Sequence, residues 1–178
     1  MEASSQPAAW LTDNLDVIPR DGLVLDVASG KGRNAVFLAQ RGWRVHAIDR
    51  DITDLVRLVG TLGERGAMTV EQVDLEVGTP VLGAERYDAV VVFNYLHRPL
   101  MPALVGAVRA GGVLIYETFT IGQAARGHPR NPDFLLRDGE LPTLVAPLRI
   151  IRAREGDFGG RLISSIVAVR DGGTIRSA

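Results

Sequence analysis

The segment from residue 24 to residue 49 constrains the fold of this 178-residue chain more than any other stretch. An apolar run ends in Asp26, a turn with Gly30 and Gly32 follows, and an amphipathic stretch leads to a second apolar run that ends in Asp49. This order predicts a strand, a glycine-rich turn, a helix and a strand, which together form a βαβ unit. The two glycines allow a left-handed backbone and a close ligand, and the helix start offers unpaired N–H groups to that ligand.

Two classes of cofactor use such a turn. Gly30, Gly32 and Ala35 satisfy the dinucleotide pattern G-x-G-x-x-G/A, and Asp49 stands at the offset expected for an acid that holds a ribose. Asp26 argues against a dinucleotide, because a carboxylate at the strand tip would repel the pyrophosphate that this turn binds. It suits a positively charged ligand without phosphate, and S-adenosylmethionine (SAM) is such a ligand.

The residues 26–34, D-V-A-S-G-K-G-R-N, resemble motif I of the class I SAM-dependent methyltransferases, usually written D-x-G-x-G-x-G. Ala28 stands where the motif has its first glycine. The ending Gly32-Arg33-Asn34, with a hydrophobic helix and a glycine before the next strand, is closest to the tellurite-resistance-type small-molecule methyltransferases. The superfamily resemblance covers residues 23–170, whereas the narrower one rests on far fewer residues.

Periodicity and turn residues predict the remaining elements. We expect helices over 7–15, 53–65, 99–110 and 140–145, and strands over 69–73, 87–93, 113–119, 148–154 and 161–170. The connection over 155–160 is too short for a helical crossover, so the last two strands should form an antiparallel hairpin. A long polar loop is expected over 120–139.

These elements predict an α/β fold of one domain over residues 1–178, with its core over 22–170 and a loose tail over 172–178. Five βα units followed by a hairpin are typical of the class I methyltransferase fold, a Rossmann-like, doubly wound seven-stranded sheet of order 3-2-1-4-5-7-6. For the helix over 7–15, with Pro7 in its first turn, two interpretations stay open. It packs against an edge of the sheet, or it forms a flap over the cofactor.

Composition limits the classes of partner. The net charge is −1 and the sequence pI is about 6.3, so no basic field for nucleic acid is expected. The absence of cysteine excludes disulfides and thiolate metal sites, and we expect no metal site. No apolar run reaches membrane-spanning length, and the start lacks the pattern of a signal peptide. We therefore expect a cytoplasmic monomer or homodimer that acts on a small molecule.

The acids at the strand tips are the main candidates for cofactor binding, because ligands of open parallel sheets bind beyond the carboxyl ends of the strands. Asp26 is expected to bind the methionine end of SAM, and Asp49 both ribose hydroxyls. By the resemblance, Asp74 contacts the adenine amino group and Leu75 packs on the ring. The other expected cofactor contacts are Ala28, Ser29, Gly30, Gly32, Asn34, Arg50 and Asn94.

The acceptor side of the site is expected after the fourth and fifth strands. His97 is the candidate general base, because its unperturbed pKa lies near neutrality, and Tyr95 is expected to border the methyl group. Whether a base is required stays open, because an already deprotonated nucleophile needs none. Arg126, His128 and Arg130 of the polar loop form either a solvated face or a lid over an anionic acceptor.

The sequence therefore predicts an enzyme that transfers a methyl group from SAM to a small molecule, with an anionic or soft nucleophile among the candidate acceptors. Two alternatives remain. A non-catalytic SAM-binding protein would keep the same four residues Asp26, Gly30, Gly32 and Asp49. An NAD-dependent reductase is disfavoured by Asp26 and by the terminal hairpin.

Overall fold

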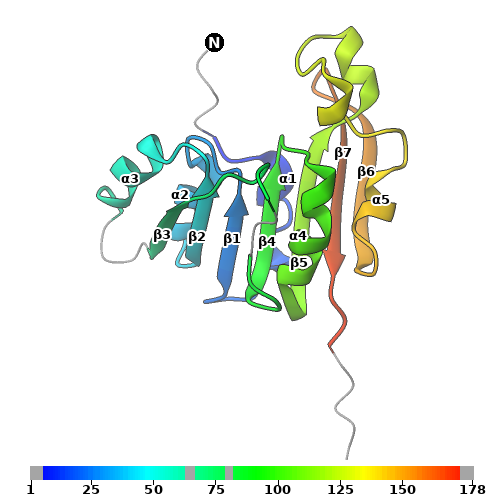
Figure 1. Ribbon diagram of the computed structural model, residues 1–178. Helices are drawn as coiled ribbons and strands as arrows, with labels where there is room; N and C mark the ends of the chain where they lie inside the picture. The colour runs from blue at the N-terminus through cyan, green and yellow to red at the C-terminus, as the bar shows by residue number, and fades with distance from the viewer. Residues whose placement is uncertain (1–5, 63–66, 79–81, 173–178) are drawn as a thin grey trace, which may run out of the picture.

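The computed structural model describes residues 6–62, 67–78 and 82–172, which form a seven-stranded sheet of order β3-β2-β1-β4-β5-β7-β6 (Figure 1). In chain order the elements are α1 (Ala9–Thr12), η1 (Leu15–Val17), β1 (Leu23–Val27), α2 (Arg33–Gln40), β2 (Arg44–Asp49), α3 (Thr53–Val59), β3 (Met68–Gln72), β4 (Tyr87–Phe93), η2 (Arg98–Leu100), α4 (Met101–Ala107), β5 (Val108–Phe119), η3 (Ile121–Ala125), η4 (Pro132–Phe134), α5 (Leu141–Leu144), β6 (Arg149–Phe158) and β7 (Arg161–Val169). Strands β1 to β5 pair in parallel, and β7 pairs antiparallel with β5 and β6. The predicted order and the predicted hairpin are confirmed.

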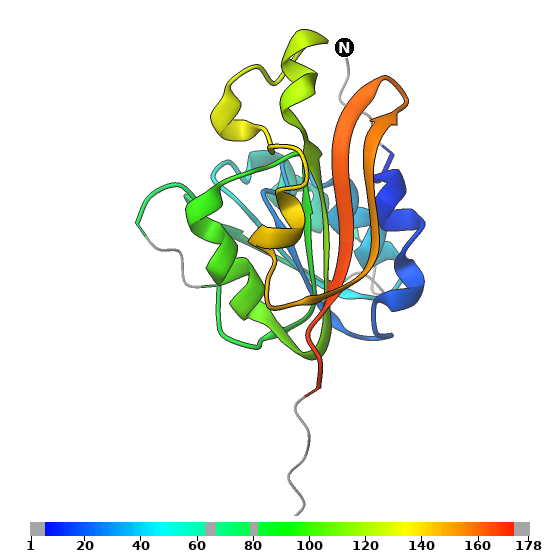
Figure 2. The same cartoon turned by 90° about the vertical axis from the view of Figure 1, so that its right-hand side faces the viewer.

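Helices cover both faces of the sheet, so the core has two layers (Figure 2). Successive residues of β4 point to opposite faces. Val90 and Val92 pack with α4 and α5, whereas Val91 and Phe93 pack with α1, α2 and α3. All residues of β4 are buried, which is why this strand is a nearly continuous apolar run in the sequence.

The N-terminal helix is shorter than predicted. α1 spans only Ala9–Thr12, and Pro7 precedes its N-cap residue Ala8 instead of lying in its first turn. The buried indole of Trp10 donates a hydrogen bond of 3.0 Å to the carbonyl of Ile166 in β7. This helix therefore packs on the sheet over β7, and its Trp10 ring also lies against the Arg154 guanidinium of the edge strand β6, 4.5 Å from the ring centroid.

The helix predicted over 99–110 ends earlier, and the next strand begins earlier, than the sequence indicated. α4 ends at Ala107, and β5 runs on through the glycine pair that was interpreted as the end of the helix. Gly111 has φ +75°, and a Cβ on Gly112 would lie 2.9 Å from the carbonyl oxygen of Asp88. The register between β4 and β5 shifts at this point, so the two glycines serve a β-bulge.

The terminal hairpin is longer than predicted, because β6 continues to Phe158 through most of the expected connection. Only Gly159 and Gly160 remain in the turn, with φ +64° and +82°. Positive φ at both central residues is the requirement of the two-residue turn that best matches the twist of a hairpin. The two glycines therefore fix the register of β6 against β7.

The remaining boundaries concern the ends of the described segments. The helix predicted over 53–65 is α3, which ends at Val59, and residues 63–65 of that prediction lie outside the described residues. The predicted tail lies outside them from residue 173 onward. Within the described part of the chain, none of the helices has the length and hydrophobicity needed to cross a membrane.

Candidate functional site

Two adjoining cavities lie at the carboxyl ends of β1, β2 and β4, where the strand order reverses. The first has a volume of about 340 Å³ and is lined by Ala28, Asp49, Arg50, Val73, Asp74, Leu75, Glu76, Asn94, Tyr95, Leu96, Pro129 and Phe134. The second, of about 690 Å³, is lined by Asp26, Ala28, Ser29, Gly30, Lys31, Gly32, Arg33, Asn34, Val36, Leu58, Phe93, Asn94 and Tyr95. Ala28, Asn94 and Tyr95 line both, so the cavities meet along these residues. All eleven residues expected to contact the cofactor line one or both.

The glycine-rich turn is held in a left-handed course by three positive φ angles, +52° at Ala28, +55° at Gly30 and +78° at Gly32. Gly32 is the N-cap residue of α2, and a Cβ there would lie 2.7 Å from the Leu55 side chain of α3. No atom lies within 4 Å of a Cβ placed on Gly30. Gly32 is thus required by packing, whereas Gly30 leaves its side of the turn open to the cavity.

Ala28→Gly is expected to stabilise the protein by about 1 kcal/mol, because a left-handed conformation costs an L-residue about 1–2 kcal/mol and costs glycine almost nothing. The control is Ala103→Gly in α4, which should destabilise by about 1 kcal/mol, as glycine does in a helix interior. Urea unfolding measures both changes. A loss of stability in Ala28→Gly would contradict the strain that its φ implies.

Asp49 ties the glycine-rich turn to the end of β2. Its Oδ2 accepts a hydrogen bond of 2.8 Å from the backbone N–H of Gly30, and its Oδ1 accepts one of 3.0 Å from that of Asp51. Asp51, which precedes the N-cap residue Ile52 of α3, accepts at its Oδ1 from the N–H of Thr53 at 3.0 Å. The carboxylate of Asp49 is therefore fixed in orientation at the lip of the first cavity, with its remaining lone pairs free for a ligand.

Asp26 is the most unusual residue of the crevice. It is 2% exposed, and its Oδ2 is buried without a hydrogen-bond partner among the described residues. Burial raises the pKa of its carboxyl to about 7, against the opposing effects of the Ser29 hydroxyl and the Arg33 guanidinium. A buried carboxylate oxygen without a donor is costly, and a ligand that brings a cationic N–H group would remove that cost.

Two further residues of the second cavity have structural contacts. The Ser29 hydroxyl donates to the carbonyl of Asp26 at 2.7 Å and so closes the turn. The side-chain oxygen of Asn34 accepts from the backbone N–H of Ala8 at 2.9 Å, which connects the start of α2 to the segment before α1. Both residues line the cavity while they stabilise its wall.

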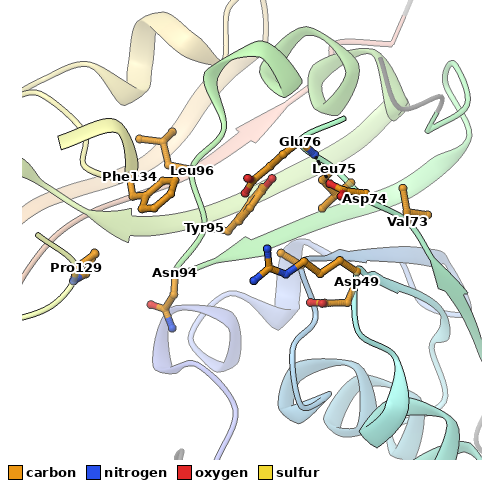
Figure 3. A pocket seen from close by; sticks show the side chains of 12 residues that line it. Asp49, Val73, Asp74, Leu75, Glu76, Asn94, Tyr95, Leu96, Pro129 and Phe134 are labelled. Atoms are coloured by element: carbon orange, nitrogen blue, oxygen red, sulfur yellow. Dashed lines mark hydrogen bonds between the residues drawn. The ribbon is translucent and has the colours of Figure 1, made fainter. Parts of the chain in front are cut away.

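The first cavity has an acidic side and an aromatic side (Figure 3). The side chains of Tyr95 and Glu76 lie next to each other, and Asp74 accepts a hydrogen bond of 2.9 Å from the N–H of Glu76. The Tyr95 hydroxyl is buried without a partner among the described residues, and burial together with Glu76, Asp74 and Asp49 raises its pKa. Tyr95 therefore stays neutral at physiological pH and cannot serve as a base.

The loop predicted over 120–139 is ordered and forms part of the cavity wall. Pro129 and Phe134 of this loop line the first cavity, and the loop contains η3 and η4. Within it, Leu136 is fully buried and exchanges backbone hydrogen bonds with Phe119 and Ile121. The role of Phe134 could not be predicted from the local sequence, because its place depends on contacts with a distant segment.

Arg98 provides that contact. Its guanidinium donates to Glu140 at 2.7 and 2.8 Å, to the carbonyl of Asp133 at 3.0 Å and to that of Leu135 at 2.9 Å. The Glu140 side chain is 15% exposed, and Arg98 lowers its pKa. A bidentate pair of this kind fixes direction as well as distance. Arg98 therefore holds η4 and Phe134 against the cavity.

Arg98→Ala is expected to destabilise the protein by about 2–3 kcal/mol, because the change leaves a half-buried carboxylate and two carbonyls without their donor. The matched control is Arg126→Ala, which breaks an exposed ion pair with Asp157 and should cost less than about 1 kcal/mol. Urea unfolding measures the free energy of unfolding of both variants. Equal losses would show that Arg98 is no more than another surface cation.

Of the residues expected on the acceptor side, Tyr95 lines both cavities, whereas His97, Arg126, His128 and Arg130 line neither. His97 precedes η2 as its N-cap residue, and Arg126 is paired with Asp157 of the hairpin. The backbone carbonyl of His128, not its ring, accepts from Gln123 at 3.3 Å. The described contacts do not place His97, Arg126, His128 or Arg130 in the lining of either cavity, and their assignment stays a prediction.

Comparison with known proteins agrees with this geometry. A family model described as a methyltransferase domain matches residues 24–111. Over these residues, just under half of the chain, the sequence is similar to methyltransferase domains. No curated protein sequence matches it.

Solved structures of methyltransferases share the fold of this chain. The crystal structure of TehB from Haemophilus influenzae is similar with a TM-score of 0.73 and 18% identity over 90% of this chain, which spans only 61% of that chain. The magnesium protoporphyrin IX methyltransferase ChlM from Synechocystis PCC 6803, solved with bound SAH, has 17% identity, coverage of 92% and 80% of the two chains, and a TM-score of 0.68. The 1,6-didemethyltoxoflavin-N1-methyltransferase from Burkholderia thailandensis, solved with its substrate and S-adenosylhomocysteine (SAH), has 18% identity, coverage of 92% and 76%, and a TM-score of 0.67.

The acceptor groups of the crevice fit SAM. Its ammonium matches the unpartnered Oδ2 of buried Asp26, and its ribose hydroxyls match the oriented carboxylate of Asp49. An adenine ring matches the first cavity, where Leu75 and Phe134 offer apolar surface and Asp74 offers an acceptor. A pyrophosphate, in contrast, would meet Asp26 directly below the turn.

Proposed function

We propose that this methyltransferase moves a methyl group from SAM to a small-molecule acceptor. The observation that carries the proposal is the buried Asp26 carboxylate, whose Oδ2 has no partner among the described residues and which lines the second cavity together with the glycine-rich turn. SAM supplies a methyl group on a sulfonium, a carbon already activated for displacement. The protein then has to bind, orient and exclude water.

The cofactor residues divide the binding between the two cavities. Asp26 accepts from the ammonium, Asp49 accepts from both ribose hydroxyls, and Asp74 accepts from the adenine amino group. Leu75 and Phe134 cover the ring, with Arg50 at the outer side. The remaining contacts come from the turn and from the start of α2, through Ala28, Ser29, Gly30, Gly32 and Asn34, and from Asn94 between the cavities.

Catalysis by orientation alone fits the geometry best. In-line placement of two reactants can supply most of the acceleration of such a displacement. Tyr95, whose hydroxyl stays neutral, borders both cavities and acts as a wall, and Asn94, with φ +57°, turns the chain at the point where they meet. The acceptor would then enter as an already deprotonated nucleophile, and no general base is required.

His97→Ala is therefore expected to change kcat less than about threefold, well short of the 10²–10⁴-fold loss that follows removal of a general base. The reason is that His97 does not line either cavity. Steady-state kinetics with the first acceptor identified measures the change. A hundredfold fall in kcat with KM unchanged would establish His97 as the base.

The loop over 120–139 forms the outer wall of the crevice and holds the other proposed acceptor contacts, Arg126, His128 and Arg130. The Arg126–Asp157 ion pair joins this loop to the hairpin, which fixes Arg126 on the side of the loop that faces β6. A near-neutral charge and a small crevice favour a small molecule over nucleic acid or a membrane surface as partner. We also propose one domain, a cytoplasmic location, and a monomer or homodimer.

Calorimetry with SAM, SAH and NAD tests the proposal. SAM and SAH should bind in the micromolar range and NAD should give no heat. Tight NAD binding without heat from SAM would favour a reductase instead. Transfer of labelled methyl to any acceptor separates an enzyme from the second candidate, a non-catalytic SAM-binding protein, which would bind SAM and transfer nothing.

A further inference from the structure

Asn94 stands where the two cavities meet, and its backbone is fixed there by β5. It follows β4 with a left-handed φ of +57° and lines both cavities. Its N–H donates a hydrogen bond of 2.9 Å to the carbonyl of Glu117, and the carbonyl of Tyr95 accepts one of 2.6 Å from the Tyr116 hydroxyl. Figure 3 shows the side chains of Asn94 and Tyr95 pointing away from each other. The direction in which the Asn94 side chain leaves the backbone is therefore set by the sheet.

The Asn94 amide is oriented by an arginine of the terminal hairpin. Arg161, the first residue of β7, donates a hydrogen bond of 2.5 Å from its guanidinium to the Oδ1 of Asn94. A guanidinium carries donors only, so the atom that faces it has to be the amide oxygen and not the amide nitrogen. The same guanidinium lies over the Phe119 ring, 4.7 Å from its centroid, which limits its own movement. This contact therefore decides which end of the Asn94 amide is left for a ligand.

The end that is left is the Nδ2 group with its two N–H donors. No hydrogen bond of this group is found among the residues that the structure describes. The three acids to which the proposed function gives groups of the cofactor are Asp26 in the second cavity and Asp49 and Asp74 in the first. Ionised carboxylates accept hydrogen bonds and cannot donate them. A donor at the junction of the cavities thus serves a different kind of atom, one with a free lone pair.

We infer that Arg161 is a positioning residue of the cofactor site, which holds Asn94 as a hydrogen-bond donor to an oxygen of bound SAM. The inference rests on the proposed function, in which the adenosine part occupies the first cavity and the methionine part the second. SAM carries its oxygens on the ribose and on the methionine carboxylate, and both groups accept hydrogen bonds. The ammonium needs an acceptor, so it is no partner of this amide group and stays with Asp26. Arg161 lines neither cavity and acts through Asn94.

Asn94→Asp separates this role from a merely structural one. The aspartate keeps an oxygen for Arg161, adds a charge to that contact and tolerates a left-handed φ as asparagine does, but it has no N–H group to donate. SAH should bind this variant about tenfold or more weakly than the wild type, because the ligand oxygen loses its donor. The free energy of unfolding should be unchanged or higher. Calorimetry with SAH and urea unfolding, both on the full chain, measure the two quantities.

A double-mutant cycle tests whether Arg161 acts through Asn94. Arg161→Met should weaken SAH binding about threefold or more, because the released amide is no longer held in the binding orientation. Arg161→Lys should restore part of this loss, since an ammonium can still donate to the amide oxygen. In the Asn94→Ala background, Arg161→Met should change the affinity no further. Arg20→Met is the matched control and should leave SAH binding unchanged, because the Arg20 guanidinium lies over Trp43 and lines neither cavity.

A second ligand, 5′-methylthioadenosine, lacks the amino-acid part of SAH and locates the oxygen. A loss in Asn94→Asp with both ligands places the donor on the ribose, and a loss with SAH alone places it on the carboxylate. If Asn94→Asp binds SAH as tightly as the wild type or more tightly, or if Arg161→Met costs as much without the Asn94 amide as with it, the inference is overturned. SAH binding by the wild type would still support the cofactor site. If the wild type fails to bind SAH, the proposed function fails, and this inference fails with it.

Discussion

Asp49→Ala is expected to weaken SAM binding by on the order of 30- to 100-fold, because it removes hydrogen bonds worth about 1–3 kcal/mol and also loosens the turn. The loosening of the turn lowers the affinity further, because the same carboxylate accepts hydrogen bonds from the N–H groups of Gly30 and Asp51. A ligand that binds the turn then has to order it first. Calorimetry with SAM and SAH measures the change.

Asp49→Asn is the closest control, because its single amide oxygen retains about half of the acceptor capacity. Its affinity for SAM should lie between the affinities of the wild type and of the alanine variant. Asp51→Ala removes the side-chain oxygen that accepts, at 3.0 Å, from the N–H of Thr53 at the start of α3, but it leaves Asp49 in place. It should lower stability by about 1 kcal/mol with little effect on SAM. Equal affinities in Asp49→Ala and the wild type would mean that the ribose is bound elsewhere.

The parts of the fold set by local pattern were predicted correctly. β4 reads as a buried strand because both of its faces are covered, and a chain that is apolar on both faces needs no tertiary information to be identified. The positions of Asp26 and Asp49 could also be predicted from the local pattern, because an acid at the end of a parallel strand lies at the carboxyl edge of the sheet. All the predicted cofactor residues therefore fall in the two cavities.

The errors occur where one segment depends on another. The glycine pair 111–112 has the composition of a helix end, but Gly112 is required by the backbone of β4, with a Cβ there 2.9 Å from the Asp88 carbonyl. Phe134 has no periodic neighbours, and it reaches the cavity only because Arg98 and Glu140 hold its loop. Neither contact has a signature in the local sequence.

The prediction of the acceptor residues was limited in the same way, because it used the local sequence alone. His97, Arg126, His128 and Arg130 were chosen for their chemistry and their place after a strand, which fixes a neighbourhood but not the direction of a side chain. Arg161 was not chosen, because it begins a strand of the hairpin, 67 residues from Asn94 in sequence. Only the antiparallel pairing of β7 with β5 brings its side chain to the crevice.

The pH dependence of SAM binding should depend on Asp26. Burial raises the pKa of this carboxyl to about 7, so at pH 5.5 it is almost entirely protonated and offers no charge to the ammonium. The affinity for SAM should therefore rise roughly twentyfold between pH 5.5 and pH 7.5, as the ionised fraction of a group of that pKa does. Calorimetry across this range measures the rise, and Asp26→Asn should bind SAM weakly and show almost none of it.

The stability of the unliganded protein should move in the opposite direction with pH. The unfolded chain loses the Asp26 proton near the ordinary pKa of 3.8, whereas the folded protein keeps it until about pH 7, so between these values the folded state binds more protons. This group therefore lowers the free energy of unfolding as pH rises through that window, and the loss is complete above it. Asp26→Asn, which carries no charge, should lack this component and gain stability relative to the wild type at pH 7.5 but not near pH 4. Urea unfolding of both proteins at both pH values measures the difference. If the wild type is more stable than Asp26→Asn at pH 7.5, the Asp26 carboxylate has a partner in the folded protein and is not available to a cationic ligand.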